Sequence, residues 1–298
     1  MISAPHGGGL FPDNIPNRTR GCLKNSTCVW SHDVCNQSST VNCQITTVRD
    51  TITDEFAQNV AKQLVEMYNL HPFLVIGQWN RKIVDFNREI SEATFNHPEA
   101  MSGYQSYHQF LSEGIRRIEN QYGKGLLLDI HGHIQGNYTM VGYLLTSADL
   151  NNENFDNVQT SIEQLLQSST DRRQSVIGDN SFGSILEEND LSIVYPSRMN
   201  PKPGQNRFYA GGYITQHYRS SKMNVIQTEL SYEILGANEE KEYAKKYAQS
   251  VYQFMVKNNL LVSQSYSIFV SSKNVSFKRI VLLMMTQVLT YWRISIKI

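Results

Sequence analysis

Apolar and polar positions along this chain follow two patterns, helical spacing and short apolar runs, which predict alternating helices and strands. Apolar residues at helical spacing predict helices at residues 53–64, 100–122, 158–167 and 239–258, with Thr53 as the N-cap of the first. Short apolar runs predict strands at residues 73–79, 126–131, 140–146, 192–195 and 225–230. Strands that alternate with helices favour a sheet covered on both faces. The pattern therefore predicts an α/β fold with a mixed, largely parallel sheet.

Two histidines follow one of these apolar runs, in the segment Leu126–His133 (LLLDIHGH). His131 and His133 would lie at the carboxyl end of a strand, where α/β sheets bind their ligands. Upstream, His6 is followed by three glycines, which let the backbone turn tightly beside the imidazole. A lone histidine is more often structural, but histidines at two strand ends together favour a metal site.

Zinc is the metal that suits these residue types. A catalytic zinc has three protein ligands, drawn from histidine nitrogen and carboxylate oxygen, and keeps one position for water. Asp50 and Glu55, before and on the start of the first predicted helix, can each complete a His/His/carboxylate set with His6 and His131. The sequence leaves the choice between the two carboxylates open.

Other residue types typical of a hydrolase site follow further predicted strands. Arg81 and the run Asp85–Arg88 (DFNR) come after the strand at 73–79, and an arginine can grip a carboxylate through two parallel hydrogen bonds. The alternative is a surface arginine paired with Asp85 or Glu89. Glu229 lies near the end of an apolar strand, where a carboxylate is costly to bury unless it is paired or used.

All four cysteines fall in one loop at residues 20–45, which is rich in Asn, Ser and Thr. Two disulfides would fix such a loop, and three connectivities are possible. A zinc knuckle is the competing interpretation, but the loop has no C-x-x-C pair. Five Asn-x-Ser/Thr sequons point to an oxidising compartment and a secreted glycoprotein. The cysteines are Cys22, Cys28, Cys35 and Cys43, and the sequons begin at Asn17, Asn25, Asn36, Asn137 and Asn274.

The ends and the charge of the chain add further limits. No basic and apolar stretch precedes Met1–Ser3, where a first strand would begin just before His6, so a signal peptide is absent and we expect a truncated chain. We predict one domain at residues 1–264 and a tail at 265–298. The tail's apolar run, Ile280–Trp292, is shorter than the roughly 20 residues that span a bilayer, so we rank a membrane span last. Lys plus Arg equals Asp plus Glu, at 27 each, which argues against a nucleic-acid partner.

In this order, the motifs resemble the N-formylglutamate amidohydrolase family, itself similar to zinc carboxypeptidases and aspartoacylase. The likeness runs from about Ser3 to Leu260. It rests on SAPHGGG, the D-x-x-T-x-E element from Asp50 to Glu55, Arg81 with VDFNR, LLLDIHGH, SFGSILEEND leading to YPS, AGGYIT, and IQTEL. The resemblance implies a zinc-carboxypeptidase-like fold and hydrolysis of the amide bond of a small N-acyl amino acid, such as an N-formyl amino acid.

The resemblance also assigns the metal ligands. By this match His6 and His131 bind zinc, and Glu55 is preferred over Asp50 as third ligand because the helix would aim it toward the sheet end. Asp129 and His133 are then expected to orient the ligands from behind.

The remaining residues would act on the substrate. Glu229 matches the general base, and Arg88 with Asn87 matches the carboxylate clamp. Arg81 would help zinc hold the developing oxyanion, and Tyr213, in the turn AGGYIT, would contact the substrate. Two alternatives stay open: a metallocarboxypeptidase-like peptidase, because an arginine can equally grip the end of a peptide, and a non-catalytic secreted glycoprotein that keeps the fold.

Overall fold

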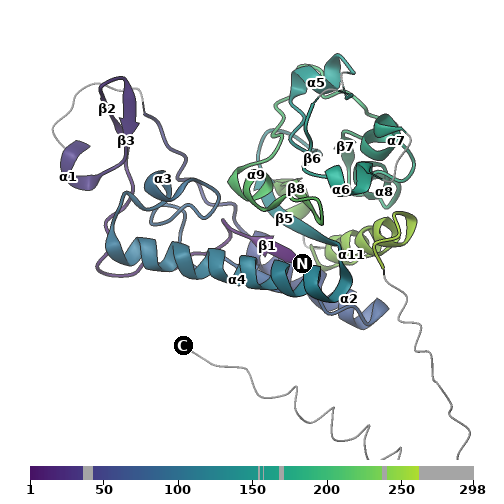
Figure 1. Ribbon diagram of the computed structural model, residues 1–298, viewed down its shortest axis with the longest axis horizontal. Helices are drawn as coiled ribbons and strands as arrows, with labels where there is room; N and C mark the ends of the chain where they lie inside the picture. The colour runs from purple at the N-terminus through teal and green to yellow at the C-terminus, as the bar shows by residue number, and fades with distance from the viewer. Residues whose placement is uncertain (36–42, 154, 157, 168–170, 237–239, 262–298) are drawn as a thin grey trace, which may run out of the picture. The chain divides into compact units, whose positions relative to one another are not determined.

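The computed structural model describes residues 1–35, 43–153, 155–156, 158–167, 171–236 and 240–261, and Met1–Val262 form one compact unit (Figure 1). The predicted tail at 265–298 and its apolar run at Ile280–Trp292 lie outside the described residues. In the described part of the chain, no helix is long and apolar enough to cross a membrane.

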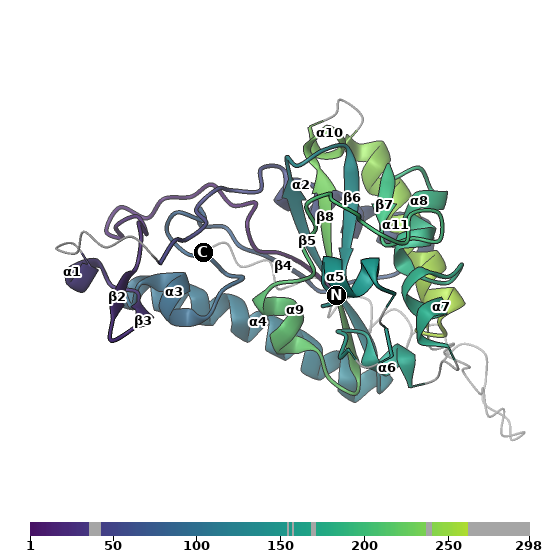
Figure 2. The same cartoon turned by 90° about the horizontal axis from the view of Figure 1, so that it is seen from above.

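Six strands form the central sheet, in the order β4-β1-β5-β8-β6-β7 (Figure 2). Neighbouring strands are parallel except for β6 and β8, which are antiparallel. The sheet is therefore mixed and largely parallel, which confirms the predicted fold class. The strands are β1 Ile2–Ala4, β4 Leu74–Ile76, β5 Gly125–His133, β6 Tyr138–Gly142, β7 Ile193–Tyr195 and β8 Met223–Ser231.

Helices cover both faces of this sheet (Figure 2). Successive strand residues point to opposite faces, so Leu126, Leu128 and Ile130 pack with α2 and α11 in one core, whereas Leu127 packs with α4 in the other. The long helices are α2 Thr53–Tyr68, α4 Pro98–Tyr122 and α11 Glu240–Lys257. The shorter ones are α3 Ile90–Thr94, α5 Ser147–Asn151, α6 Glu163–Leu166, α7 Arg172–Ile177, α8 Phe182–Glu188, α9 Tyr213–Tyr218 and α10 Tyr232–Leu235.

Three local predictions are wrong in detail. Thr53 is not an N-cap: α2 begins with it, and its hydroxyl donates to the Asp50 carbonyl at 2.7 Å. The helix predicted at 158–167 is reduced to α6, because the backbone N–H and hydroxyl of Thr160 both donate to the carboxylate of Glu163 and form a turn there. The strand predicted at 140–146 ends at Gly142, and Leu144 has a left-handed φ of 68° that extended backbone does not allow.

The cysteine-rich loop contains a two-stranded hairpin, β2 Cys22–Lys24 with β3 Thr27–Val29, followed by the short helix α1 His32–Cys35 (Figure 1). Disulfides join Cys22 to Cys35 and Cys28 to Cys43. This is one of the three connectivities that the sequence allowed, and it leaves no thiolate for a zinc knuckle.

Candidate metal centre and active site

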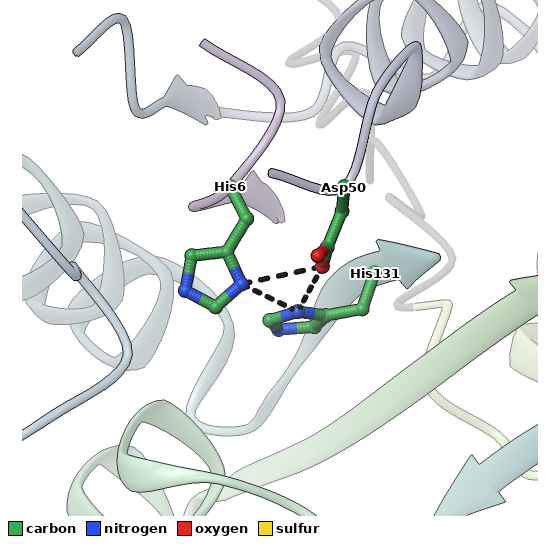
Figure 3. A group of neighbouring side chains, drawn as sticks. All are labelled: His6, Asp50 and His131. Carbon is green, nitrogen blue, oxygen red and sulfur yellow. Dashed lines mark hydrogen bonds and ion pairs between the residues drawn. The ribbon is translucent and has the colours of Figure 1, made fainter. Parts of the chain in front are cut away.

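The sheet brings His6 and His131 together. β1 lies beside β5 in parallel, with Ser3 level with Asp129, so the chain reaches His6 and His131 at the same end of the sheet. The loop before α2 passes over this end, and the Asp50 backbone N–H donates to the His6 carbonyl at 3.1 Å. His6, Asp50 and His131 thus face one another (Figure 3).

The three ligand atoms form a nearly regular triangle. His6 Nδ1 lies 3.1 Å from His131 Nδ1 and 3.2 Å from Asp50 Oδ2, and His131 Nδ1 lies 3.1 Å from the same oxygen (Figure 3). Ligands about 2.0–2.1 Å from a tetrahedral zinc are roughly 3.3 Å apart. The triangle therefore has the size that a single zinc ion requires.

The far nitrogen of each imidazole fixes its tautomer. His6 Nε2 lies 2.7 Å from Asp85 Oδ1, and His131 Nε2 lies 2.9 Å from Asp129 Oδ2. An ionised carboxylate accepts a hydrogen bond and cannot donate one, so in the neutral ring each Nε2 carries the hydrogen and each Nδ1 has the lone pair. Two lone pairs and a carboxylate oxygen then point at one spot, and this donor set fits a cation.

The glycines after His6 make room for this arrangement. A side chain at Gly8 would clash with the Gly77 carbonyl oxygen, and one at Gly7 would clash with Asp54 at the start of α2. The backbone of the loop can therefore lie against β4 and α2 only without side chains at these positions.

Buried charge surrounds the triangle. Burial works against an ionised Asp50, but His6 and His131 outweigh it and hold the pKa of Asp50 below its ordinary range. Burial likewise opposes a charged His131, but Asp129 raises the pKa of this imidazole well above its usual value. The site thus favours an ionised Asp50, which a carboxylate ligand to a cation must be.

Glu229 lies on the neighbouring strand, level with His131 in the β5–β8 register. Asp129 pairs with Gln227 in the same register, so these four polar residues share one face of the sheet, continuing the row that begins with Leu127. Gln227 donates to Glu229 Oε1 at 2.8 Å. Burial raises the pKa of Glu229 to about 8, and the charge of Asp50 adds to this effect while His131 opposes it.

Arg81 is buried and contacts two carboxylates, that of Asp85 behind His6 and that of Asp50 in the triangle. Its Nε donates to Asp85 at 2.8 Å, and its Nη1 lies 3.4 Å from Asp50 Oδ1. Burial disfavours its charge, but Asp85 and Asp50 together raise the pKa of Arg81. Arg81 also lines the cavity described below, as an oxyanion-binding role would require.

Asn87 and Arg88 reach the site in different ways. The Asn87 side-chain amide is buried, with its nitrogen 3.1 Å from His131 Nε2 and its oxygen accepting from the Ile214 backbone N–H at 2.7 Å. Arg88 is half-buried at the cavity wall and pairs with Glu92 at 3.4 Å, so its carboxylate partner is neither Asp85 nor Glu89.

Three residues do not make the contacts that were predicted for them. Glu55, the preferred third metal ligand, is exposed on α2 because the apolar side of the helix packs inward and turns Glu55 toward solvent. Asp50 occupies the third ligand position instead. His133 lines the cavity but donates to the Tyr138 carbonyl at 2.7 Å, and neither of its ring nitrogens contacts His6 or His131. Tyr213 packs its ring against His108 and His217 and does not line the cavity.

A cavity of about 450 Å³ opens over the triangle. Its wall includes His6, Asp50, Arg81, Asn87, Arg88, His131, Gln227 and Glu229. A small amino-acid derivative fits such a volume, and the metal triangle, the Glu229 carboxylate and the Arg88 guanidinium would all face it.

Sequence reasoning missed the role of Asp85, which the run DFNR contains. Asp85 is fully buried and also accepts from the Asn87 backbone N–H at 3.0 Å, so it supports both His6 and the loop that carries Asn87. The sequence did contain a signal for this role. Asp85 lies four residues after Arg81, and His6 as a metal ligand needs a carboxylate to orient its ring.

No protein-family model and no curated protein matches the chain. Among solved structures, N-formylglutamate amidohydrolase from Ralstonia eutropha JMP134 gives a TM-score of 0.45 at 11% identity, covering 87% of this chain and 92% of that one. A gene product from Agrobacterium tumefaciens gives 0.45 at 12%, covering 87% and 90%. The apo N-acetylmuramyl-L-alanine amidase from Mycobacterium abscessus gives 0.34 at 12%, covering 87% and 97%. These likenesses are too distant to carry a function, which rests on the residues of the site.

Proposed function

We propose that the chain is a zinc-dependent hydrolase that cleaves the amide bond of a small N-acyl amino acid. The observation that carries this proposal is the triangle of His6 Nδ1, His131 Nδ1 and Asp50 Oδ2, with sides of 3.1–3.2 Å, in the wall of a cavity that Glu229 also lines. A zinc ion held by these atoms would polarise the amide carbonyl and lower the pKa of a coordinated water from about 15.7 to about 7.

Glu229 is the proposed general base and acid. It would accept a proton from the attacking water and pass it to the amide nitrogen, so that the C–N bond breaks and a carboxylic acid and a free amino acid leave. Gln227 donates to one Glu229 oxygen, which holds that carboxyl beside His131. A cation in the triangle would favour the ionised form of Glu229, which a base requires.

Arg88 and Arg81 are the proposed anion-binding groups. Arg88 lies at the cavity wall and pairs with Glu92, and its guanidinium can donate two hydrogen bonds to the substrate carboxylate in place of that partner. Arg81, held by Asp85 and Asp50, would donate to the oxygen that gains charge as the carbonyl is attacked.

A peptidase is the second candidate, because Arg88 could equally bind the terminal carboxylate of a dipeptide. The two functions separate in one assay, with N-formyl and N-acetyl amino acids measured beside dipeptides. We expect the acylated amino acids to be hydrolysed with the higher kcat/KM. A preference for dipeptides would identify the peptidase.

The catalytic scheme is tested by metal analysis together with Glu229→Gln. We expect one zinc per chain, removed by chelators, and a fall in kcat of roughly 10²–10⁴ in the variant, since it loses proton transfer but keeps its shape. Zinc content should not change. A wild-type protein that binds no zinc and hydrolyses none of these substrates would leave the non-catalytic glycoprotein as the better account. A variant that hydrolyses at the wild-type rate would remove Glu229 from the catalytic scheme.

Secretion is proposed as well. Both disulfides form most readily in an oxidising compartment. Among the sequons in the described part of the chain, Asn17, Asn25 and Asn137 are exposed and accessible to a glycan. Expression in a eukaryotic secretory host, followed by peptide mapping, should find glycan at one or more of these positions.

A further inference from the structure

Three exposed apolar side chains line the same cavity as the metal triangle. Val48 is 71% exposed, Ile134 81% and Tyr232 52%, and all three belong to the cavity wall. We call them the apolar rim. A contiguous set of exposed apolar side chains beside a ligand cavity marks a binding surface more often than isolated ones do.

The sheet places two members of the rim next to each other. His133 and Ser231 are the last pair in the β5–β8 register, and Ile134 and Tyr232 directly follow them. Both residues therefore leave adjacent strands just beyond the end of the sheet.

Val48 lies in the same loop as Asp50, two residues before it. The Val48 carbonyl accepts from Arg81 Nη1 at 3.3 Å, so its backbone is anchored although its side chain is exposed. Asp50, two residues later, accepts from the Gly132 backbone N–H at 3.4 Å, which ties this loop to the end of β5. The segments that carry Val48 and Ile134 thus meet at Asp50, and both side chains line the cavity there.

The proposed carboxylate clamp lies on the other side. Asp50 faces Nδ1 of His131, whereas the Asn87 amide faces Nε2 of the same ring, and Arg88 follows Asn87. A substrate whose carboxylate is held by Arg88 would place its scissile amide at the triangle. Its acyl group would then extend toward the apolar rim.

We propose that the apolar rim binds the hydrocarbon chain of the acyl group, so that the preferred substrates are N-acyl amino acids with medium or long alkyl chains. This inference rests on the proposed function and names its substrate class. The polar cavity interior would hold the amino acid, and the chain would cover Val48, Ile134 and Tyr232, removing apolar surface from water.

The test is kcat/KM of the zinc-loaded full chain on N-formyl-, N-acetyl-, N-hexanoyl- and N-decanoyl-alanine, each below its micelle concentration. Full burial of a methylene corresponds to about a fourfold effect, and a half-exposed rim to roughly twofold. Decanoyl has eight more methylenes than acetyl, so we expect kcat/KM to rise by roughly 250-fold between them.

The rim is tested by Ile134→Ser and Val48→Ser, with Phe110→Ser as the matched control. Phe110 is 65% exposed on α4 and does not line the cavity. Each rim variant should lower the decanoyl-to-acetyl ratio of kcat/KM about tenfold, while Phe110→Ser should leave the ratio unchanged.

The outcomes are distinguishable. Hydrolysis of formyl and acetyl substrates with a flat or falling dependence on chain length overturns the rim inference and keeps the proposed function. Equal effects of Ile134→Ser and Phe110→Ser also overturn the inference. No hydrolysis of any member of the series overturns the proposed function, and the inference with it.

Discussion

The carboxyl end of the sheet and the disulfide-bonded loop are both rich in residue types that bind metals, yet they hold them by different forces. At the sheet end, His6, Asp50 and His131 converge with no covalent link, guided by strand register and by carboxylates behind each imidazole. In the loop, the four cysteines are joined in two disulfides, and three of them lie in the hairpin and the short helix. Ligand-type residues make a metal site only where the backbone points their lone pairs at one spot.

The largest expected effect distinguishes the two candidate carboxylate ligands, Asp50 in the loop before α2 and Glu55 on α2. Asp50→Asn keeps the shape of the side chain but removes the ligand charge, so we expect zinc affinity to fall roughly a hundredfold, as for loss of one ligand. Glu55→Gln is the matched control, and its affinity should stay at the wild-type value because Glu55 is exposed. Competition with a chromophoric chelator measures both.

Equal losses in the two variants would contradict the triangle. Because Asp50 also lies near Arg81, thermal denaturation of apo Asp50→Asn should accompany the titration, to show that the apo protein remains folded.

The second-largest expected effect on zinc affinity comes from Asp129, which is not a ligand but orients the ligand His131. In Asp129→Asn the acceptor behind His131 Nε2 loses its negative charge, so the hydrogen on Nε2 is held less firmly and Nδ1 becomes a weaker ligand. We expect zinc affinity to fall about 10- to 100-fold. Ser3→Ala, which removes the hydroxyl that donates to the other Asp129 oxygen, should change affinity much less.

A pH series sharpens the same point with the unaltered chain. The pKa of His131 is raised well above its usual value, so below that pKa a proton must leave Nδ1 before a cation can bind. Zinc affinity should therefore increase with pH, about tenfold per unit while one proton is displaced. Chelator competition at pH 6, 7 and 8 measures the slope, and an affinity independent of pH would contradict a protonated His131 in the apo protein.

How far the sequence predicts this molecule depends on the range of the interactions involved. The apolar runs that end at His131 and Glu229 predict two strands, and parallel pairing then places the two residues level with each other. The buried residues Phe56 and Val60 define the inner side of α2, from which the outward position of Glu55 could have been derived. The local sequence pattern was therefore enough to predict most strands of the sheet and the positions of His6 and His131.

Features set by turns and tertiary contacts were out of reach. Asp50 faces the histidines because Ile52 takes a left-handed φ of 75° and Thr53 bonds back to the Asp50 carbonyl, a turn that no hydrophobic pattern predicts. The sequence allowed three disulfide connectivities. Cys22 can reach Cys35 because Cys22 pairs with Val29 in the hairpin, and α1 brings the Cys35 Sγ to the Val29 carbonyl.

The smallest expected effect on the site comes from breaking the loop. Cys28→Ser with Cys43→Ser removes a disulfide that closes a 15-residue separation, so the free energy of unfolding should fall by about 3 kcal/mol. Zinc affinity should stay within about twofold of wild type, because none of the described residues from 20 to 43 lines the cavity. Urea denaturation and chelator competition on the same variant test both expectations.

Arg18 explains why this loop can be opened without moving the site, and it provides the contrasting variant. Its buried guanidinium donates to the carbonyls of Thr46 and Arg81, so it ties the base of the loop to the backbone that carries the site. Arg18→Lys cannot reproduce this fork and should lower both stability and zinc affinity. If the disulfide variant weakened zinc binding as much as Arg18→Lys does, the loop and the sheet end would have to be treated as one structural unit.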